Sequence, residues 1–412
     1  MWIDIRPLKR NRDFRYVYFG QFVSFFGTMM SLVALPYQIY HLTNSTLSVG
    51  LLGVVELVPL LLTAFIGGAL ADVLDRRKLL IRAELGMAIG CLCLVGNAFS
   101  SHPQLWFVYL IAAILSSLTG LHRPSLDALM PRLVSHEEIQ ATSVLSMFGG
   151  TFGMVGGPAI AGITIASLGL SWIYFFDFLT FLFSLIALVQ VKSIAPPDNQ
   201  EQPSLKSVFV AIQYTMKRQE LLGTYVVDFV AMIFAMPNAL FPAIAVMLGG
   251  TKVLGWLYTA PAVGALIITI FSAWTKKIKR QGAAVSLAAI TWGVAIACVG
   301  LSHQFLIILF FLMLSGAADC VSGIFRTTIW NETIPDRLRG RMASLGMISY
   351  MSGPLLGSAQ VGFLASLTTT KIAILIGGIL CVVGVTLSII LLPAFWKYYP
   401  KNESIKKWGV IV

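Results

Sequence analysis

Charged residues are scarce in this chain. They make up 11% of its 412 residues, while 57% are hydrophobic. A soluble globular protein carries about 25% charged residues. The charge is too little to cover the surface of a soluble molecule of this length. The composition therefore excludes an ordinary soluble protein and predicts a membrane protein that is embedded in a lipid bilayer.

Acidic residues are fewer than basic ones, at 18 against 29, and the net charge of +11 raises the possibility of nucleic-acid binding. The distribution of the basic residues argues against it. Only Lys252 and Lys371 fall in the loops that would face outside, and the others lie in the alternate loops, the tails or the inner helix ends. This positive-inside pattern places both termini in the cytoplasm. The basic charge thus indicates membrane topology, and nucleic acid is excluded as a partner.

The chain also lacks the short alternating segments of a membrane β-barrel. It has apolar runs of about 20 residues, the length that crosses a bilayer as a helix. No small-residue cleavage site follows the first run, which is therefore expected to be a retained helix. We predict an all-α membrane protein with twelve transmembrane helices, at roughly 14–40, 47–71, 79–99, 104–126, 138–167, 171–191, 219–247, 253–275, 281–301, 304–325, 341–367 and 371–395.

Signals for catalysis, metals and cofactors are few. The five cysteines all fall inside predicted helices without disulfide or zinc spacing, so no metal site and no cofactor is expected. The sequence contains no P-loop, G-x-S-x-G or H-E-x-x-H motif. An enzyme remains an alternative only through the H-x-x-x-x-D spacing of His122 and Asp127. A non-transporting sensor or scaffold is a second alternative, which the lack of an appended signalling domain disfavours.

One polar break divides the chain into two halves. Residues 192–218 open with "KSIAPPDNQEQPSLKS" and are interpreted as a cytoplasmic linker with a surface helix. Six predicted helices precede it in residues 1–191, and six follow it in residues 219–412. "GGTFGMVGGPAIAG" on the fifth helix and "MISYMSGPLLGSAQVG" on the eleventh both carry a Gly-Pro pair at mid-helix. These matching positions predict two six-helix pseudo-repeats.

The segment "GGALADVLDRRKLL" places a dense charge cluster between the second and third helices. Gly68, Asp72, Arg76 and Arg77 fit the G-x-L-A-D-x-x-x-R-R pattern, and on this basis the chain resembles the major facilitator superfamily. The Gly-Pro run of the fifth helix is similar to a motif of that superfamily's exporters, and its residues are Gly153, Gly156, Gly157, Pro158 and Gly162. Small residues of this kind also permit close helix packing, which is the simpler interpretation.

The resemblance implies a conformational latch on the cytoplasmic side. Asp72 would accept hydrogen bonds from the free N–H groups at the start of the eleventh helix, where the helix dipole favours a negative charge. Arg76 would complete the latch, and Gly68 would allow the helices to approach closely. Arg77 belongs to the same latch cluster, although a topology signal alone would also account for it. The corresponding loop of the second half, "WTKKIKRQ", contains no acid, so the latch is expected on one side only.

Ionisable residues inside membrane helices are costly and often mark ion or substrate paths. The resemblance implies that the first, fourth, seventh and tenth helices line a central cavity. Asp228 on the seventh helix and Asp319 on the tenth are therefore the leading candidates for proton coupling or substrate binding. Further candidates are Glu56, Asp177, Arg123, which could pair with Asp127, and Gln21. Ser116 stands where many proton antiporters of the superfamily carry an arginine, so this chain lacks that arginine.

The region around the first two helices, "LPYQIYHLTNSTLSVGLLGVVELVPLLL", resembles the exporter group that contains siderophore exporters and macrolide efflux pumps. The resemblance implies a monomer in the inner membrane that exports a medium-sized organic molecule in exchange for protons, with alternating access of the two halves. A siderophore is the favoured substrate. Hydrophobic drugs such as macrolides are the second possibility, and lysophospholipid is the third.

Overall fold

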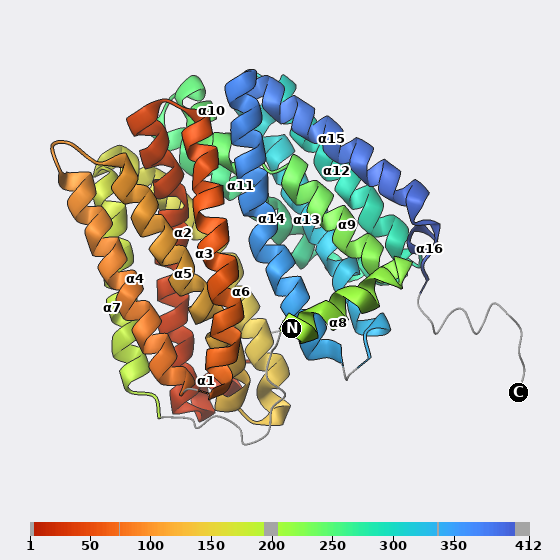
Figure 1. The fold of residues 1–412 in the computed structure, drawn as a ribbon, viewed down its shortest axis with the longest axis horizontal. Helices are drawn as coiled ribbons and strands as arrows, with labels where there is room; N and C mark the ends of the chain where they lie inside the picture. The colour runs from red at the N-terminus through yellow and green to blue at the C-terminus, as the bar shows by residue number, and fades with distance from the viewer. Residues whose placement is uncertain (1–3, 74, 193–204, 336–337, 400–412) are drawn as a thin grey trace, which may run out of the picture. The chain divides into compact units, whose positions relative to one another are not determined.

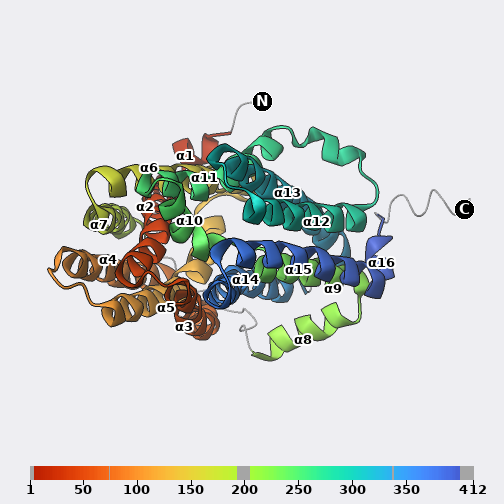
Figure 2. The same ribbon diagram turned by 90° about the horizontal axis from the view of Figure 1, so that it is seen from above.

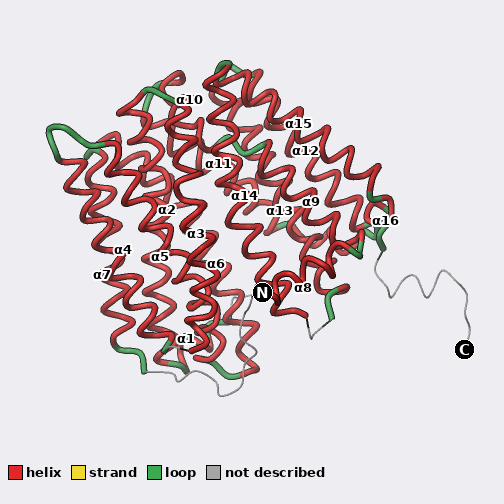
Figure 3. The backbone as a smooth tube through the Cα atoms, in the orientation of Figure 1, coloured by secondary structure: helices red, strands yellow, loops and turns green. Residues whose placement is uncertain are grey.

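The computed structural model describes residues 4–73, 75–192, 205–335 and 338–399 of the chain. All regular secondary structure in these ranges is helical, and no strand occurs in them, as Figure 3 shows by its colouring. The predicted all-α membrane fold is confirmed. Figure 1 shows the order of the helices along the chain.

The membrane spans are built from the following helices. They are α2 (Arg12–Thr43), α3 (Thr46–Val73), α4 (Arg76–Phe99), α5 (Leu105–Leu129), α6 (Ile139–Ser167), α7 (Leu170–Val189), α9 (Gln219–Phe234), α10 (Phe241–Leu248), α11 (Thr251–Ile270), α12 (Gln281–Leu301), α13 (Phe305–Thr333), α14 (Arg339–Leu367) and α15 (Thr370–Leu391). Among the described residues, eleven segments are long and apolar enough to cross a membrane, with α9 and α10 counted as one segment. The 29-residue helix α14 matches the remaining predicted span.

Short helices connect or flank these spans. They are α1 (Arg6–Arg10), α8 (Leu205–Met216), α16 (Pro393–Trp396) and the 3-10 turns η1 (Met130–Leu133), η2 (His136–Glu138), η3 (Asn238–Leu240) and η4 (Ser272–Lys277). η1 and η2 form the connection between α5 and α6. η3 interrupts the seventh span, where α9 ends at Phe234 and α10 begins at Phe241. Pro237 and Pro242 lie on either side of η3. Proline cannot continue the hydrogen-bonding ladder of a helix, which accounts for the break. The seventh span is therefore not one continuous helix.

The helix α4 illustrates how a span is built. Leu85, Ile89 and Leu92 are about half exposed along one side of it. The other side buries Met87 and Cys91 against Phe181 of α7. A helix that is apolar on its exposed side as well as its packed side is suited to lipid rather than water.

The residues group into two compact units, one of 1–204 with 242–259 and one of 205–241 with 260–412. In the first unit, α2 packs against α6 and α7, α3 packs against α5, and α4 packs against α5 and α7 (Figure 2). Its cytoplasm-proximal core, by the predicted topology, contains Val17, Leu80, Leu129 and Leu188. The sequence-based division at residues 191 and 218 stays a prediction.

In the second unit, α12 packs against α13 and α15, and α9 packs against α12, α14 and α15. Small residues allow the closest approaches. A Cβ atom on Gly378 of α15 would lie 2.5 Å from the carbonyl oxygen of Gly293 on α12. Such a contact requires glycine, because neither backbone can move away cheaply. Close packing through small residues is a common way for helices to associate in lipid.

Candidate functional site

A cluster of opposite charges lies within the second unit. Arg326 of α13 forms an ion pair with Asp228 of α9, and Arg326 Nη2 lies 3.6 Å from Asp319 Oδ1. The side chains of Arg326 and Asp228 are 11% and 9% exposed, whereas that of Asp319 is 42% exposed. The two acids that the sequence favoured are thus brought to one arginine, one of them buried and the other accessible.

The spacing on α13 explains part of this arrangement. Asp319 and Arg326 are seven residues apart, which is about two helical turns, so both side chains fall on the same face. A charge buried in a helical bundle is tolerated when an opposite charge pairs with it. Sequence reasoning did not identify Arg326 as the partner of these acids. The seven-residue spacing was the signal that could have identified it as the partner of the acids.

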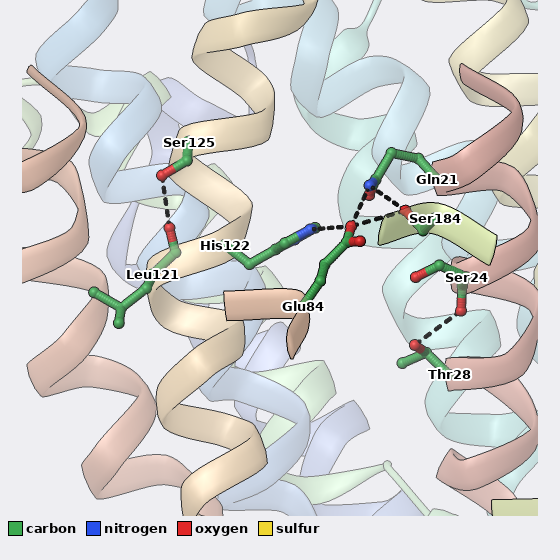
Figure 4. Close-up of polar contacts among 8 residues, drawn as sticks. All are labelled: Gln21, Ser24, Thr28, Glu84, Leu121, His122, Ser125 and Ser184. Carbon is green, nitrogen blue, oxygen red and sulfur yellow. Dashed lines mark hydrogen bonds and ion pairs between the residues drawn. The ribbon is translucent and has the colours of Figure 1, made fainter. Parts of the chain in front are cut away.

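A second polar cluster joins four helices of the first unit (Figure 4). Its centre is Glu84 of α4, whose side chain is fully buried. Gln21 Nε2 of α2 donates to Glu84 Oε1 at 2.5 Å, and Ser184 Oγ of α7 donates to the same oxygen at 3.0 Å. His122 Nε2 of α5 lies 3.2 Å from it. Gln21 was a sequence candidate, whereas the role of Glu84 as the centre of a cluster was missed.

Asp177 of α7 is buried in a separate network. It accepts hydrogen bonds from Ser31 Oγ of α2 and, at 3.5 Å, from Cys91 Sγ of α4. Thr180 Oγ1 on its own helix lies 3.3 Å from Asp177 Oδ1. These contacts join three helices and give each carboxylate oxygen a polar neighbour. This arrangement supports helix packing more directly than it supports ion transfer.

The remaining intramembrane candidates are less enclosed. Glu56 of α3 is partly buried, and its backbone carbonyl accepts a hydrogen bond from Ser116 Oγ at 2.7 Å. Ser116 stands at the position of the arginine that the resemblance leads one to expect, and here it ties α5 to α3. Arg123 and Asp127 are both exposed. The arginine that contacts the candidate acids Asp228 and Asp319 is thus Arg326 of the second unit, not Arg123.

The proposed latch falls partly outside what the structure describes, because the surroundings of Gly68 and the side chains of Asp72 and of residues 339–341 are not included. Arg76 and Arg77 are described. Arg76 is 2% exposed, and its Nη1 donates to the carbonyl oxygen of Ala128 at 3.0 Å. Arg77 Nε donates to the carbonyl oxygen of Leu188 at 3.0 Å. Both arginines thus satisfy carbonyl groups at helix C-termini, where cations are favoured.

The glycines of the fifth-helix motif lie against bulky residues of α2. A Cβ atom on Gly153 would approach the Phe25 ring to 2.6 Å, and one on Gly156 would approach the Phe26 ring to 2.7 Å. The Phe26 ring also packs against Phe152 of α6, with 6.1 Å between ring centroids. The motif therefore provides space for phenylalanine side chains along the interface between α2 and α6.

The same motif also makes backbone contacts. A Cβ atom on Gly157 would lie 2.6 Å from Met29 Cβ, and one on Gly162 would lie 2.7 Å from Gly255 Cα of α11. Pro158 is buried between these two glycines. Its carbonyl oxygen would lie 2.8 Å from a Cβ atom on Gly255. These residues thus allow α6 to pack closely against α2 and α11.

Comparison with known proteins identifies the family of this chain. The family described as transmembrane secretion effector matches residues 4–404. The chain is 25% identical to the enterobactin exporter EntS of Citrobacter koseri and 26% identical to that of Shigella boydii, with 94% of each chain covered in both cases. Both relatives therefore align with this chain over nearly its whole length.

Solved transporters share the fold. The nucleoside transporter NupG superposes with a TM-score of 0.73 at 12% identity, over 94% of this chain and 99% of that chain. A POT family transporter in complex with a thioalcohol-conjugated peptide gives a TM-score of 0.74 at 12% identity, over 93% and 96% of the two chains. The protein belongs to the transmembrane secretion effector family of the major facilitator superfamily, and it is a membrane transporter rather than an enzyme.

Proposed function

We propose that this protein is a secondary active exporter that moves a siderophore from the cytoplasm outward across the inner membrane in exchange for protons. The observation that carries the proposal is the similarity to enterobactin exporters over 94% of both chains. Similarity over the whole length includes both sets of helices and the connections between them. A medium-sized organic substrate and alternating access of the two halves are part of this proposal.

The cluster of Asp228, Arg326 and Asp319 supports proton coupling. Arg326 is paired with Asp228, and Asp319 lies 3.6 Å from its other terminal nitrogen. A proton that binds Asp228 would remove the negative charge and release Arg326 toward Asp319. Loss of that proton would restore the first pair. A charged group with two alternative partners can respond to protonation by changing position.

The exposure of the three side chains suits this exchange. Asp319, at 42% exposure, is accessible to protons or to a cationic group of the substrate, whereas Asp228 is held in the interior. Intramembrane acids with a defined partner commonly belong to ion or substrate paths. We assign Asp228 as the coupling residue and Asp319 as the residue that exchanges with the aqueous path.

The fifth-helix glycines and the arginines of the G-x-L-A-D-x-x-x-R-R segment would serve the conformational change. Arg76 and Arg77 fix the ends of α5 and α7 through backbone carbonyls. This would make the cytoplasmic ends of these helices move as one body. Asp72 and Gly68 would complete the latch of the cytoplasmic side, and its opening would alternate with that of the outer side.

Uptake into inverted membrane vesicles tests the proposal. The vesicles contain the wild-type protein or the Asp228→Asn or Asp319→Asn variant, and the probe is enterobactin. An acid-inside gradient should drive uptake by the wild type, and both variants should lose the gradient-driven part. Uptake by the wild type that is the same with and without the gradient would contradict proton coupling. Full gradient-driven uptake by both variants would show that the coupling residues are elsewhere.

A further inference from the structure

Glu84 is fully buried between α2, α4, α5 and α7, and within the described part of the chain no arginine or lysine contacts it. Three side chains contact the same oxygen, Oε1. The other oxygen, Oε2, is buried and has no hydrogen-bond partner among the described residues. The carboxyl group is therefore enclosed but only half satisfied.

His122 is the titratable group that contacts Glu84 in the described ranges, at 3.2 Å. Helices that pack around Glu84 carry other charged or titratable groups, and none of these has a described contact with it. They are Arg76, Arg77, Lys78, Arg82, Cys91 and Cys93 on α4, Tyr109, Arg123 and Asp127 on α5, Tyr174 and Asp177 on α7, Glu56 on α3 and Arg12, Asp13, Arg15, Tyr16, Tyr18, Tyr37, Tyr40 and His41 on α2. The charge state of Glu84 is therefore coupled first to that of His122.

An isolated carboxylate in such an interior is strongly unfavourable. One proton shared by Glu84 and His122 removes the net negative charge. The pair is then either a carboxylic acid beside a neutral imidazole or a carboxylate beside an imidazolium. Loss of this proton leaves a net negative charge in the bundle. Gln21 and Ser184 can donate to Glu84 Oε1 in either case, and Oε2 has no competing partner among the described residues when it carries the acid hydrogen.

We propose that Glu84 and His122 form a proton-binding site in the first unit, separate from the cluster of Asp228, Arg326 and Asp319. This inference rests on the proposed proton coupling for its physiological role. The His122 side chain is 12% exposed, while that of Glu84 is fully buried. His122 therefore passes protons between the surface of the unit and Glu84. Gln21 is a positioning residue that connects the pair to α2, the first membrane span (Figure 4).

A purely structural role for Glu84 predicts different behaviour. Glutamine in its place keeps a carbonyl oxygen that accepts from Gln21 and Ser184, so Glu84→Gln would preserve the helix contacts. It would, however, remove the group that binds the proton. The two explanations separate when proton binding is measured directly, without transport.

The experiment uses the full-length protein in detergent and dicyclohexylcarbodiimide, a reagent that modifies protonated carboxyl groups. Modification of Glu84 is quantified by peptide mass spectrometry across a pH series. We expect it to decline as the pH rises. In His122→Gln, Glu84 alone must hold the proton, so the pH dependence of its modification should differ from that of the wild type. Glu84→Gln should lose the modification at this peptide.

Several results would overturn the proposal. They are modification of Glu84 that is equal at every pH, modification that occurs only after unfolding, and a midpoint that His122→Gln leaves unchanged. Protection of Glu84 by sodium chloride at constant pH, without an effect of pH itself, would make the cluster a sodium site. Because no substrate is present, a failure of the proposed siderophore export leaves this measurement unaffected. Vesicle uptake by Glu84→Gln with a flattened pH profile would connect the site to transport.

Discussion

Arg326 of α13 forms a buried ion pair with Asp228 of α9, while Asp319, two turns back along α13, lies 3.6 Å from another nitrogen of the same guanidinium. One cation is thus shared by two acids of unequal exposure. The pair connects the span that η3 interrupts to a long continuous span. A change in the charge of Asp228 therefore alters a contact between these two helices.

Removal of the buried acid should destabilise the protein. Asp228→Asn leaves Arg326 without its nearest counter-charge in the interior, and breaking a buried pair in this way costs about 3–5 kcal/mol. Asp319→Asn is the matched control, because its partly exposed side chain contributes at most about 1 kcal/mol. Chemical denaturation of the purified proteins in detergent measures the difference. The double variant Asp228→Asn/Arg326→Gln should recover much of the loss, and equal stabilities of the two single variants would contradict the assignment.

The arginines after the second span should differ from the lysine beside them. Arg76→Gln removes a buried donor to the Ala128 carbonyl, and an unsatisfied buried group costs about 1–3 kcal/mol. Lys78 is exposed on the same helix, so Lys78→Gln should have little effect. Thermal unfolding in detergent compares the two. A loss of stability in Lys78→Gln that equals that in Arg76→Gln would indicate a general effect of charge.

The glycines of α6 offer a comparison within one helix. A methyl group on Gly162 would meet the backbone of Gly255, whereas a methyl group on Gly150 would meet nothing within 4 Å. Both Gly→Ala changes have the same effect on helix propensity, so their difference isolates packing. Gly162→Ala should be less stable than Gly150→Ala by about 1–3 kcal/mol, the usual cost of overpacking. Equal unfolding free energies would show that the contact is not tight.

The positive-inside pattern makes a topology prediction. The connection of residues 100–104 between α4 and α5 should face outside, and the connection that holds η1 and η2 should face the cytoplasm. Alkaline phosphatase, which is active only outside the cytoplasm, reports the side of a fusion. A fusion at Ser101 should be active, and a fusion at His136 should be inactive. The reverse result would invert the direction of transport that is proposed.

The helices could be predicted from the sequence because each span is an apolar run of membrane length. Asp228 and Asp319 were noticed because acids are costly in a membrane. They were favoured because the resemblance implies that their helices line the central cavity. Their partner Arg326 was not identified, because pairing across α9 and α13 depends on how the helices are arranged. Arg76 and Arg77 similarly bind carbonyl groups that are 52 and 111 residues away.

The Glu84 cluster shows the same limit. Gln21, Glu84, His122 and Ser184 come from four separate helices, and each one alone has an ordinary explanation as an isolated polar residue. The spacing of His122 and Asp127 even suggested an enzyme motif, whereas His122 lies beside Glu84 of another helix. Only helix packing places these residues together.

The most direct test of the account is the distribution of a siderophore in iron-starved cells that synthesise enterobactin, with and without this gene as their exporter. Chelator in the medium and chelator inside the cells are both measured. The account predicts that cells without the gene secrete less and accumulate the compound, and that the wild-type gene restores secretion while Asp228→Asn does not. Equal secretion and equal internal levels with and without the gene would contradict siderophore export.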